Sequence, residues 1–166
     1  MTEMKIRNGF VSNSSSSSFI IIGNGEHSTE RPCLVDDGVL VIGNIGETQF
    51  GWERREYRSM WDKINFAYMQ AMYLKGGQGD AWLEMLNDVL KKKFNASSVV
   101  YLVGIDWCGD EVETEYGRIC QGYIDHQSAS YEGDNTEMFD NEDSLERFLF
   151  CEDSYIQGSN DNDYYG

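Results

Sequence analysis

Two helical patterns follow one another directly in the middle of the chain, with strand-like segments before and after them. Over residues 53–75, apolar side chains recur at steps of three and four, which predicts a helix with one apolar face. Gly76 and Gly77 are expected to end this helix, and Asp80 is expected to cap a second helix that ends near residue 94. Two successive helices between runs of strands favour an α+β fold over strict βα alternation.

The predicted strands are short runs rich in β-branched residues, separated by glycine turns. The clearest are Phe19–Ile22, Val39–Ile42, Glu47–Trp52, Ser98–Ile105, Glu111–Tyr116, Arg118–His126 and Ser154–Gln157. We expect Val39–Ile42 and Glu47–Trp52 to form a strand pair. The serine run Ser14–Ser18 is expected to be a polar loop or the exposed approach to the strand at Phe19–Ile22. A third, short helix is expected over residues 143–151, opened by a capping box at Asp143–Glu146.

These elements predict a single domain over residues 1–158, followed by a polar tail over residues 159–166. The sheet is expected to be antiparallel or mixed, and to be packed by the helices at about 53–75, 80–94 and 143–151. Hydrophobic residues make up 40% and aromatic residues 13% of the 166-residue chain, which is enough for a substantial core.

The negative charge is concentrated in the last two-fifths of the chain. Residues 101–166 hold 17 acidic and 2 basic side chains, a net charge of −15, whereas the whole chain carries −16. Such a surface repels phosphate backbones and anionic lipid, so no direct nucleic-acid or membrane binding is expected. The asymmetry favours a basic protein as partner.

The first residues contain no apolar stretch typical of a signal peptide, and no apolar run is long enough to span a bilayer. We therefore expect the chain to stay in the cytoplasm where it is made. The four cysteines show no metal-binding spacing and are expected to be reduced and mostly buried.

Catalytic motifs are sparse. His126 has Asp125 as its neighbour, but adjacent residues of a strand point to opposite faces, so Asp125 is poorly placed to orient it. A nucleophile pairing of His126 with Cys108 or Cys120 requires a geometry that the sequence does not show. The glycine turns after the first two strands lack the spacing of nucleotide-binding loops, so no cofactor is expected.

Carboxylates form two groups that resemble metal-ligand sets only in number. Asp106, Asp110 and Glu111 make up the first group, and the second contains Asp134, Asp140, Glu142 and Asp143. Neither group has the glycine and terminal glutamate of a calcium-binding loop. A metal-dependent hydrolase built on the first group is thus one alternative, supported by carboxylate density alone, and no bound metal is expected.

The acidic side chains also suggest a row that imitates nucleic-acid phosphates. Alternate residues of a strand lie about 6.6–6.8 Å apart, close to the spacing of successive phosphates. Candidate partner-binding residues are therefore Glu111, Glu113 and Glu115 on one strand, extended by Asp134, Glu137, Asp140, Glu142 and Asp143. Such a surface would occupy the lysines and arginines of a nucleic-acid-binding protein. The alternative is an acidic face that only maintains solubility.

The segment Lys5–Ile20, with the sequence KIRNGFVSNSSSSSFI, resembles the opening of a group of small uncharacterised phage and bacterial proteins. The resemblance covers about a tenth of the chain and implies a phage or mobile-element origin, hence a bacterial host cytoplasm. Together with the charge, it favours a non-enzymatic, phage-encoded accessory protein that binds and inhibits a basic host protein. A virion-associated or assembly protein is the second hypothesis, because the aromatic residues could serve a subunit interface.

Overall fold

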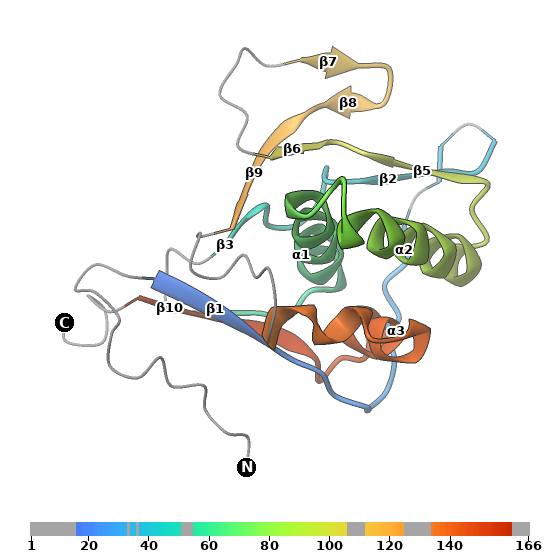
Figure 1. Ribbon diagram of the computed structural model, residues 1–166. Coiled ribbons are helices and arrows are strands. Elements are labelled where there is room, and N and C mark those ends of the chain that lie inside the picture. The colour runs from blue at the N-terminus through green and yellow to red at the C-terminus, as the bar shows by residue number, and fades with distance from the viewer. Residues whose placement is uncertain are drawn as a thin grey trace.

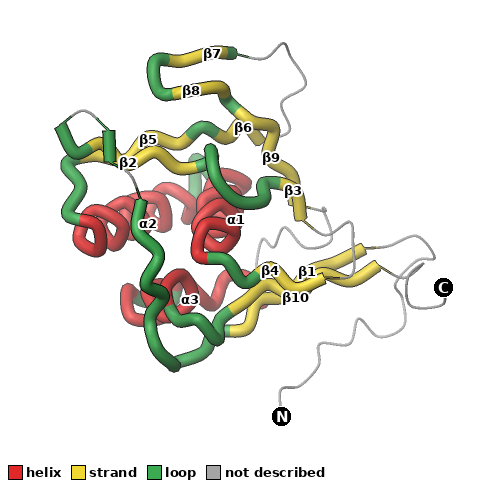
Figure 2. Tube along the Cα trace, turned by 180° about the vertical axis from the view of Figure 1, so that it is seen from behind, coloured by secondary structure: helices red, strands yellow, loops and turns green. Residues whose placement is uncertain are grey.

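Helices α1 (Met60–Tyr73) and α2 (Gln78–Phe94) form a central layer between two layers that contain strands (Figure 1). The computed structural model describes residues 16–32, 34–35, 37–50, 55–105, 112–124 and 134–160. In this part of the chain, short parallel strands cover one side of the helix pair. Helix α3 (Glu142–Phe150) and an antiparallel sheet cover the other side (Figure 2). The predicted α+β class is confirmed.

Helix α1 is buried on nearly all sides because it lies between the two outer layers. Every residue from Met60 to Ala71 is buried, including polar Asp62, Lys63, Asn65 and Gln70. The helix starts later than the predicted residue 53. The Ser59 hydroxyl accepts a hydrogen bond from Trp61 N at 3.0 Å and caps the first turn. The preceding residues Arg55–Tyr57 instead form strand β4.

Helices α2 and α3 begin within two residues of the predicted positions, but both predicted caps are wrong. Gly77, not Asp80, precedes α2, and Asp80 lies inside its first turn. Asn141, not Asp143, is the N-cap, and its Oδ1 accepts a hydrogen bond from Ser144 N at 2.8 Å. Asp143 lies inside the first turn, where its charge favours the positive end of the helix dipole. Both residues are good caps by type, and their positions in the folded chain distinguish them.

Replacing Asn141 with alanine is therefore expected to lower the free energy of unfolding by about 1 kcal/mol, the usual cost of losing a side-chain cap. Urea denaturation of the variant and the wild type measures this loss. Asp143→Ala is the matched comparison and should cost less, because it removes only a screened charge–dipole interaction and one ion pair at the surface, with Arg147. A larger loss for Asp143→Ala would restore the predicted capping box.

The antiparallel sheet has the strand order β1–β10–β4 and joins the two ends of the described chain. Strand β1 (Ser16–Ile21) pairs with β10 (Tyr155–Asn160) from Ser16 opposite Asn160 to Ile21 opposite Tyr155. The prediction of a loop is thus wrong for Ser16–Ser18, which lie in a strand. Strand β10 also extends into the segment predicted as a tail, while residues 161–166 lie outside the described part. Pairing with a distant strand supplies hydrogen bonds that make a serine run extended.

The strands of the other layer pair in parallel, except for one antiparallel hairpin. Strand β2 (Val39–Ile42) pairs with β5 (Ser98–Tyr101), and β9 (Cys120–Ile124) pairs with both β6 (Val103–Ile105) and β3 (Gln49–Phe50). The predicted pairing of Val39–Ile42 with Glu47–Trp52 is therefore wrong, because these segments take different partners. A small hairpin of β7 (Glu113–Thr114) and β8 (Gly117–Arg118) completes this layer.

The segment between β2 and β3 crosses between strand β6 and helix α1, and glycine permits this close approach. Gly43 has φ of 103°, and a Cβ there would lie 2.7 Å from Val103 Cγ2. Asn65 then donates hydrogen bonds to the carbonyl oxygens of Ile45 and Glu47 at 3.0 and 2.9 Å. The Asp62 carboxylate accepts from Glu47 N at 2.6 Å. Polar residues of a buried helix thus hold the crossing segment in place.

One hydrophobic core joins all three layers. Phe66 of α1 makes edge-to-face contact with Phe50 of β3, with ring centroids 5.1 Å apart, and lies 6.5 Å from the ring of Phe148 in α3. All three side chains are fully buried. The aromatic residues therefore connect the parallel layer to the α3 layer through α1.

Candidate functional site

Glu113 and Glu115 of the predicted phosphate-like row lie on the β7–β8 hairpin, but not as a row along one strand. Strand β7 contains only Glu113 and Thr114, and Glu115 lies in the following turn. The Glu113 carboxylate pairs with Arg118 Nε at 3.4 Å. Glu111 is outside the described residues. The turn ends the regular two-residue spacing, so Glu113 and Glu115 do not continue a strand-based ladder.

The other predicted partner-binding carboxylates lie around the start of α3 and are called the α3 cluster below. Glu137 lies in the 3₁₀ helix η1 (Asp134–Phe139), which also includes the backbone of Asp134, and Asp140 follows it. Glu142 pairs with Lys92 of α2 at 3.2 Å, and Asp143 pairs with Arg147 at 3.1 Å. The Asp143 side chain remains 79% exposed despite this ion pair. These carboxylates form a true surface cluster, and two of them also stabilise the first turn of α3.

The two acidic groups lie on opposite sides of the molecule. In both views the β7–β8 hairpin is at the outer edge of the parallel layer, and α3 is on the far side of α1 and α2 (Figures 1 and 2). The structure therefore brings Glu137, Asp140, Glu142 and Asp143 together, and it separates them from Glu113 and Glu115. A partner contacting the α3 cluster would reach the hairpin only by wrapping around the helix pair.

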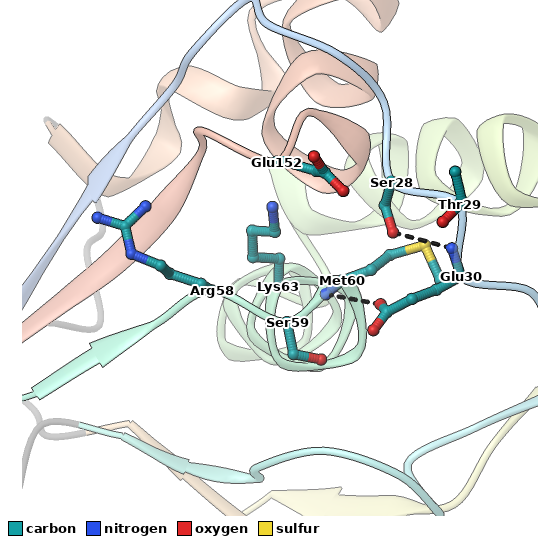
Figure 3. A pocket seen from close by; sticks show the side chains of 8 residues that line it. All are labelled: Ser28, Thr29, Glu30, Arg58, Ser59, Met60, Lys63 and Glu152. Carbon is teal, nitrogen blue, oxygen red and sulfur yellow. Dashed lines mark hydrogen bonds between the residues drawn. The ribbon is translucent and has the colours of Figure 1, made fainter.

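A polar pocket of about 220 Å³ lies at the N-terminal end of α1, and the sequence did not point to it. Its walls come from the segment after β1, the first turn of α1 and the turn after α3 (Figure 3). The side chains that line it are Ser28, Thr29, Glu30, Arg58, Ser59, Met60, Lys63 and Glu152. Four of these eight side chains are ionisable, and they comprise two cations and two carboxylates.

Lys63 is the most unusual residue of this pocket, since its side chain is only 1% exposed. Its Nζ donates hydrogen bonds to the carbonyl oxygens of Cys151 and Ser154, both at 2.9 Å, and so ties α1 to the turn after α3. Burial lowers the pKa of this amine to about 8, because desolvation disfavours the charged form. One sequence signal could have pointed to this burial: Lys63 lies one helical turn after Met60, on the apolar face of the predicted helix.

Hydrogen bonds and an ion pair hold the rest of the pocket wall in place. Glu30 Oε1 accepts from Met60 N at 3.3 Å, and Ser28 Oγ accepts from Glu30 N at 3.0 Å. Arg58 pairs with Glu56 at 2.8 Å and lies 3.9 Å above the ring of Tyr155. These contacts fix the orientation of Glu30 and Arg58 at the pocket before any ligand is bound.

The metal and catalytic hypotheses fall largely on residues that the structure does not describe. Asp106, Asp110, Glu111, Cys108 and His126 all lie outside the described residues. Within the described ranges, no group of three or more histidine, cysteine and carboxylate side chains is placed to hold a metal ion. Likewise, no helix there is long and apolar enough to cross a membrane.

Comparison of the chain with protein-family models, with curated protein sequences and with solved structures gave no match.

Proposed function

We propose that the chain is a non-enzymatic accessory protein that binds, and thereby inhibits, a basic nucleic-acid-binding protein through the carboxylates around η1 and α3. The observation that carries the proposal is the net charge of −15 over residues 101–166. Charge of one sign attracts a partner of opposite sign and raises the rate of encounter. The resemblance of Lys5–Ile20 to phage proteins supports a phage origin and a bacterial host protein as the partner.

The α3 cluster is the better contact surface of the two acidic groups. Asp140, Glu142 and Asp143 are exposed and adjacent, whereas the hairpin offers only Glu113 and Glu115 among the described residues. Glu142 pairs with exposed Lys92 and Asp143 with half-buried Arg147, and such pairs at the surface contribute only about 0–1 kcal/mol. A basic partner can therefore replace Lys92 and Arg147 at little cost.

The test compares three double variants, each of which removes two negative charges. Asp140→Asn with Asp143→Asn neutralises the α3 cluster, and Glu113→Gln with Glu115→Gln neutralises the hairpin. Glu84→Gln with Asp88→Asn, on the exposed side of α2, is the matched control. The partner is first captured from nuclease-treated bacterial lysate and identified. Its affinity for each variant is then measured across a salt series.

The α3 variant is expected to bind about tenfold more weakly at low salt and to show a shallower salt dependence. The hairpin and α2 variants should stay within about twofold of the wild type, because both leave the carboxylates of the α3 cluster unchanged. Equal weakening in all three variants would mean that binding depends on the net charge of the protein and not on the α3 cluster. Failure to retain any basic protein at low salt would contradict the proposed function itself.

A further inference from the structure

The pocket at the start of α1 places charges of both signs around one cavity without pairing them. In the described part of the chain, Lys63, Glu30 and Glu152 take part in no ion pair. Lys63 is nevertheless buried, and its two hydrogen bonds go to neutral carbonyl groups. The carboxylates of Glu30 and Asp153 attract this ammonium group without forming an ion pair with it. A buried charge without a close partner is unfavourable, so an anionic group beside Lys63 would stabilise the site.

The pocket also has unused hydrogen-bonding capacity of both kinds. A lysine ammonium has three donors, and Lys63 uses two of them. The hydroxyls of Ser28 and Ser59 accept from backbone amides, which leaves each O–H able to donate. The carboxylates supply the acceptors. Glu152 is an exposed carboxylate in the wall, and Glu30 uses one of its oxygens to accept from Met60 N.

Figure 3 shows how these groups are distributed around the cavity. In this view Lys63 lies between Arg58 on one side and Ser28 with Glu30 on the other, and Glu152 reaches the pocket from the turn after α3. Cationic donors and carboxylate acceptors thus face a common space of about 220 Å³. This volume is below the range of drug-sized ligand sites, so the occupant must be small.

We propose that this pocket binds a small zwitterion of the α-amino acid class. Its carboxylate accepts hydrogen bonds from Lys63, with Ser28 and Ser59 as further donors, and its ammonium group donates to Glu152. A simple anion would leave Glu152 without a partner and close to a second negative charge. A simple cation would add to the charge of Lys63. A ligand that carries both signs satisfies both halves of the wall.

This site is separate from the acidic α3 cluster and does not depend on the proposed function. Its ligand would contact α1 through Lys63 and Ser59, and the turn after α3 through Glu152. Binding should therefore raise the unfolding temperature, because the ligand joins two layers of the folded protein and has no site in the unfolded chain.

The experiment measures thermal unfolding of the full chain, and then calorimetric binding, with each of the common L-amino acids. Acetate and methylamine, which are the two halves of glycine without the zwitterion, are measured alongside, as are inorganic phosphate and calcium chloride. At least one amino acid is expected to raise the unfolding temperature, and neither half should do so. Glu152→Gln is expected to weaken that binding by about tenfold, the scale of one charge-assisted hydrogen bond.

Glu152→Gln changes an exposed side chain and should leave the fold intact, whereas Lys63→Met also removes two structural hydrogen bonds. Asp88→Asn on α2 is the control for loss of one negative charge and should bind like the wild type. Equal stabilisation by acetate or phosphate would make this a simple anion site, and stabilisation by calcium a cation site. Either result, or the absence of binding by every amino acid, overturns the proposal.

Discussion

The free energy of unfolding of the wild-type protein is expected to contain a contribution from Lys63 that rises by about 3 kcal/mol between about pH 7 and pH 10.5. Replacing Lys63 with methionine is expected to remove this rise. The relevant quantity is the difference in free energy of unfolding between wild type and Lys63→Met at each pH. Taking this difference cancels the titration of all other groups that behave alike in both proteins. Urea denaturation at closely spaced pH values provides it.

The sign follows from where the proton is bound. Burial lowers the pKa of Lys63 to about 8 in the folded protein, below its ordinary value of 10.5. Between these two values the unfolded chain holds more protons than the folded chain, so raising the pH favours the folded state. Below about pH 8 both states are protonated, and the folded protein carries the full cost of the buried charge.

Lys75→Met is the matched control, because it removes a positive charge from an exposed position just after α1. Its difference from the wild type should vary by less than about 0.5 kcal/mol over the same pH range. If the Lys63 difference is equally flat, the amine is not desolvated in the folded protein. That result would also remove the buried charge on which the amino acid pocket is argued.

Phe66→Ala is expected to lower the free energy of unfolding by roughly 3–5 kcal/mol, the range measured for buried aromatic residues. The Phe66 side chain is fully buried and contacts both Phe50 and Phe148, so its removal leaves a cavity where three layers meet. Because small domains are stable by only about 5–15 kcal/mol, this variant should be close to unfolding. Urea denaturation followed by the fluorescence of the four tryptophans measures the loss.

Phe66→Leu is the conservative control and should cost less than about 1.5 kcal/mol, since it keeps most of the volume. A large gap between the two variants therefore reports cavity formation rather than loss of the ring itself. Similar small losses for alanine and leucine would mean that Phe66 is not enclosed between the layers. Other side chains would then have to make the packing contacts between the parallel strands and α3.

Much of the secondary structure could be predicted from local patterns. The three- and four-residue periodicity identified α1 and α2, and β-branched runs identified part of β1 and strands β2 and β5. These signals are local because helix periodicity and strand propensity act within a few residues. The ends of the elements were harder to predict. At Arg55–Tyr57, for example, pairing with β10 overrides a helical pattern.

The acidic residues illustrate the same limit for the candidate site. Their number and their concentration after residue 100 were evident from composition. Their division into a hairpin group and an α3 group depends on the path of the chain across the helix pair. A short turn at Glu115 also interrupts the expected two-residue spacing. The α3 cluster is thus recognisable only once η1 and α3 are packed together.

The sequence by itself determined the fold class, the two central helices and the acidic character of the C-terminal part. The tertiary structure alone decided which strands pair, how Ser16–Ser18 became a strand, and how Lys63 came to be buried at a polar pocket. Periodicity and charge are properties of neighbouring residues, so they can be read along the chain. Parallel pairing and the enclosure of Lys63 by Cys151 and Ser154 depend on contacts between distant segments, which form only when all layers assemble.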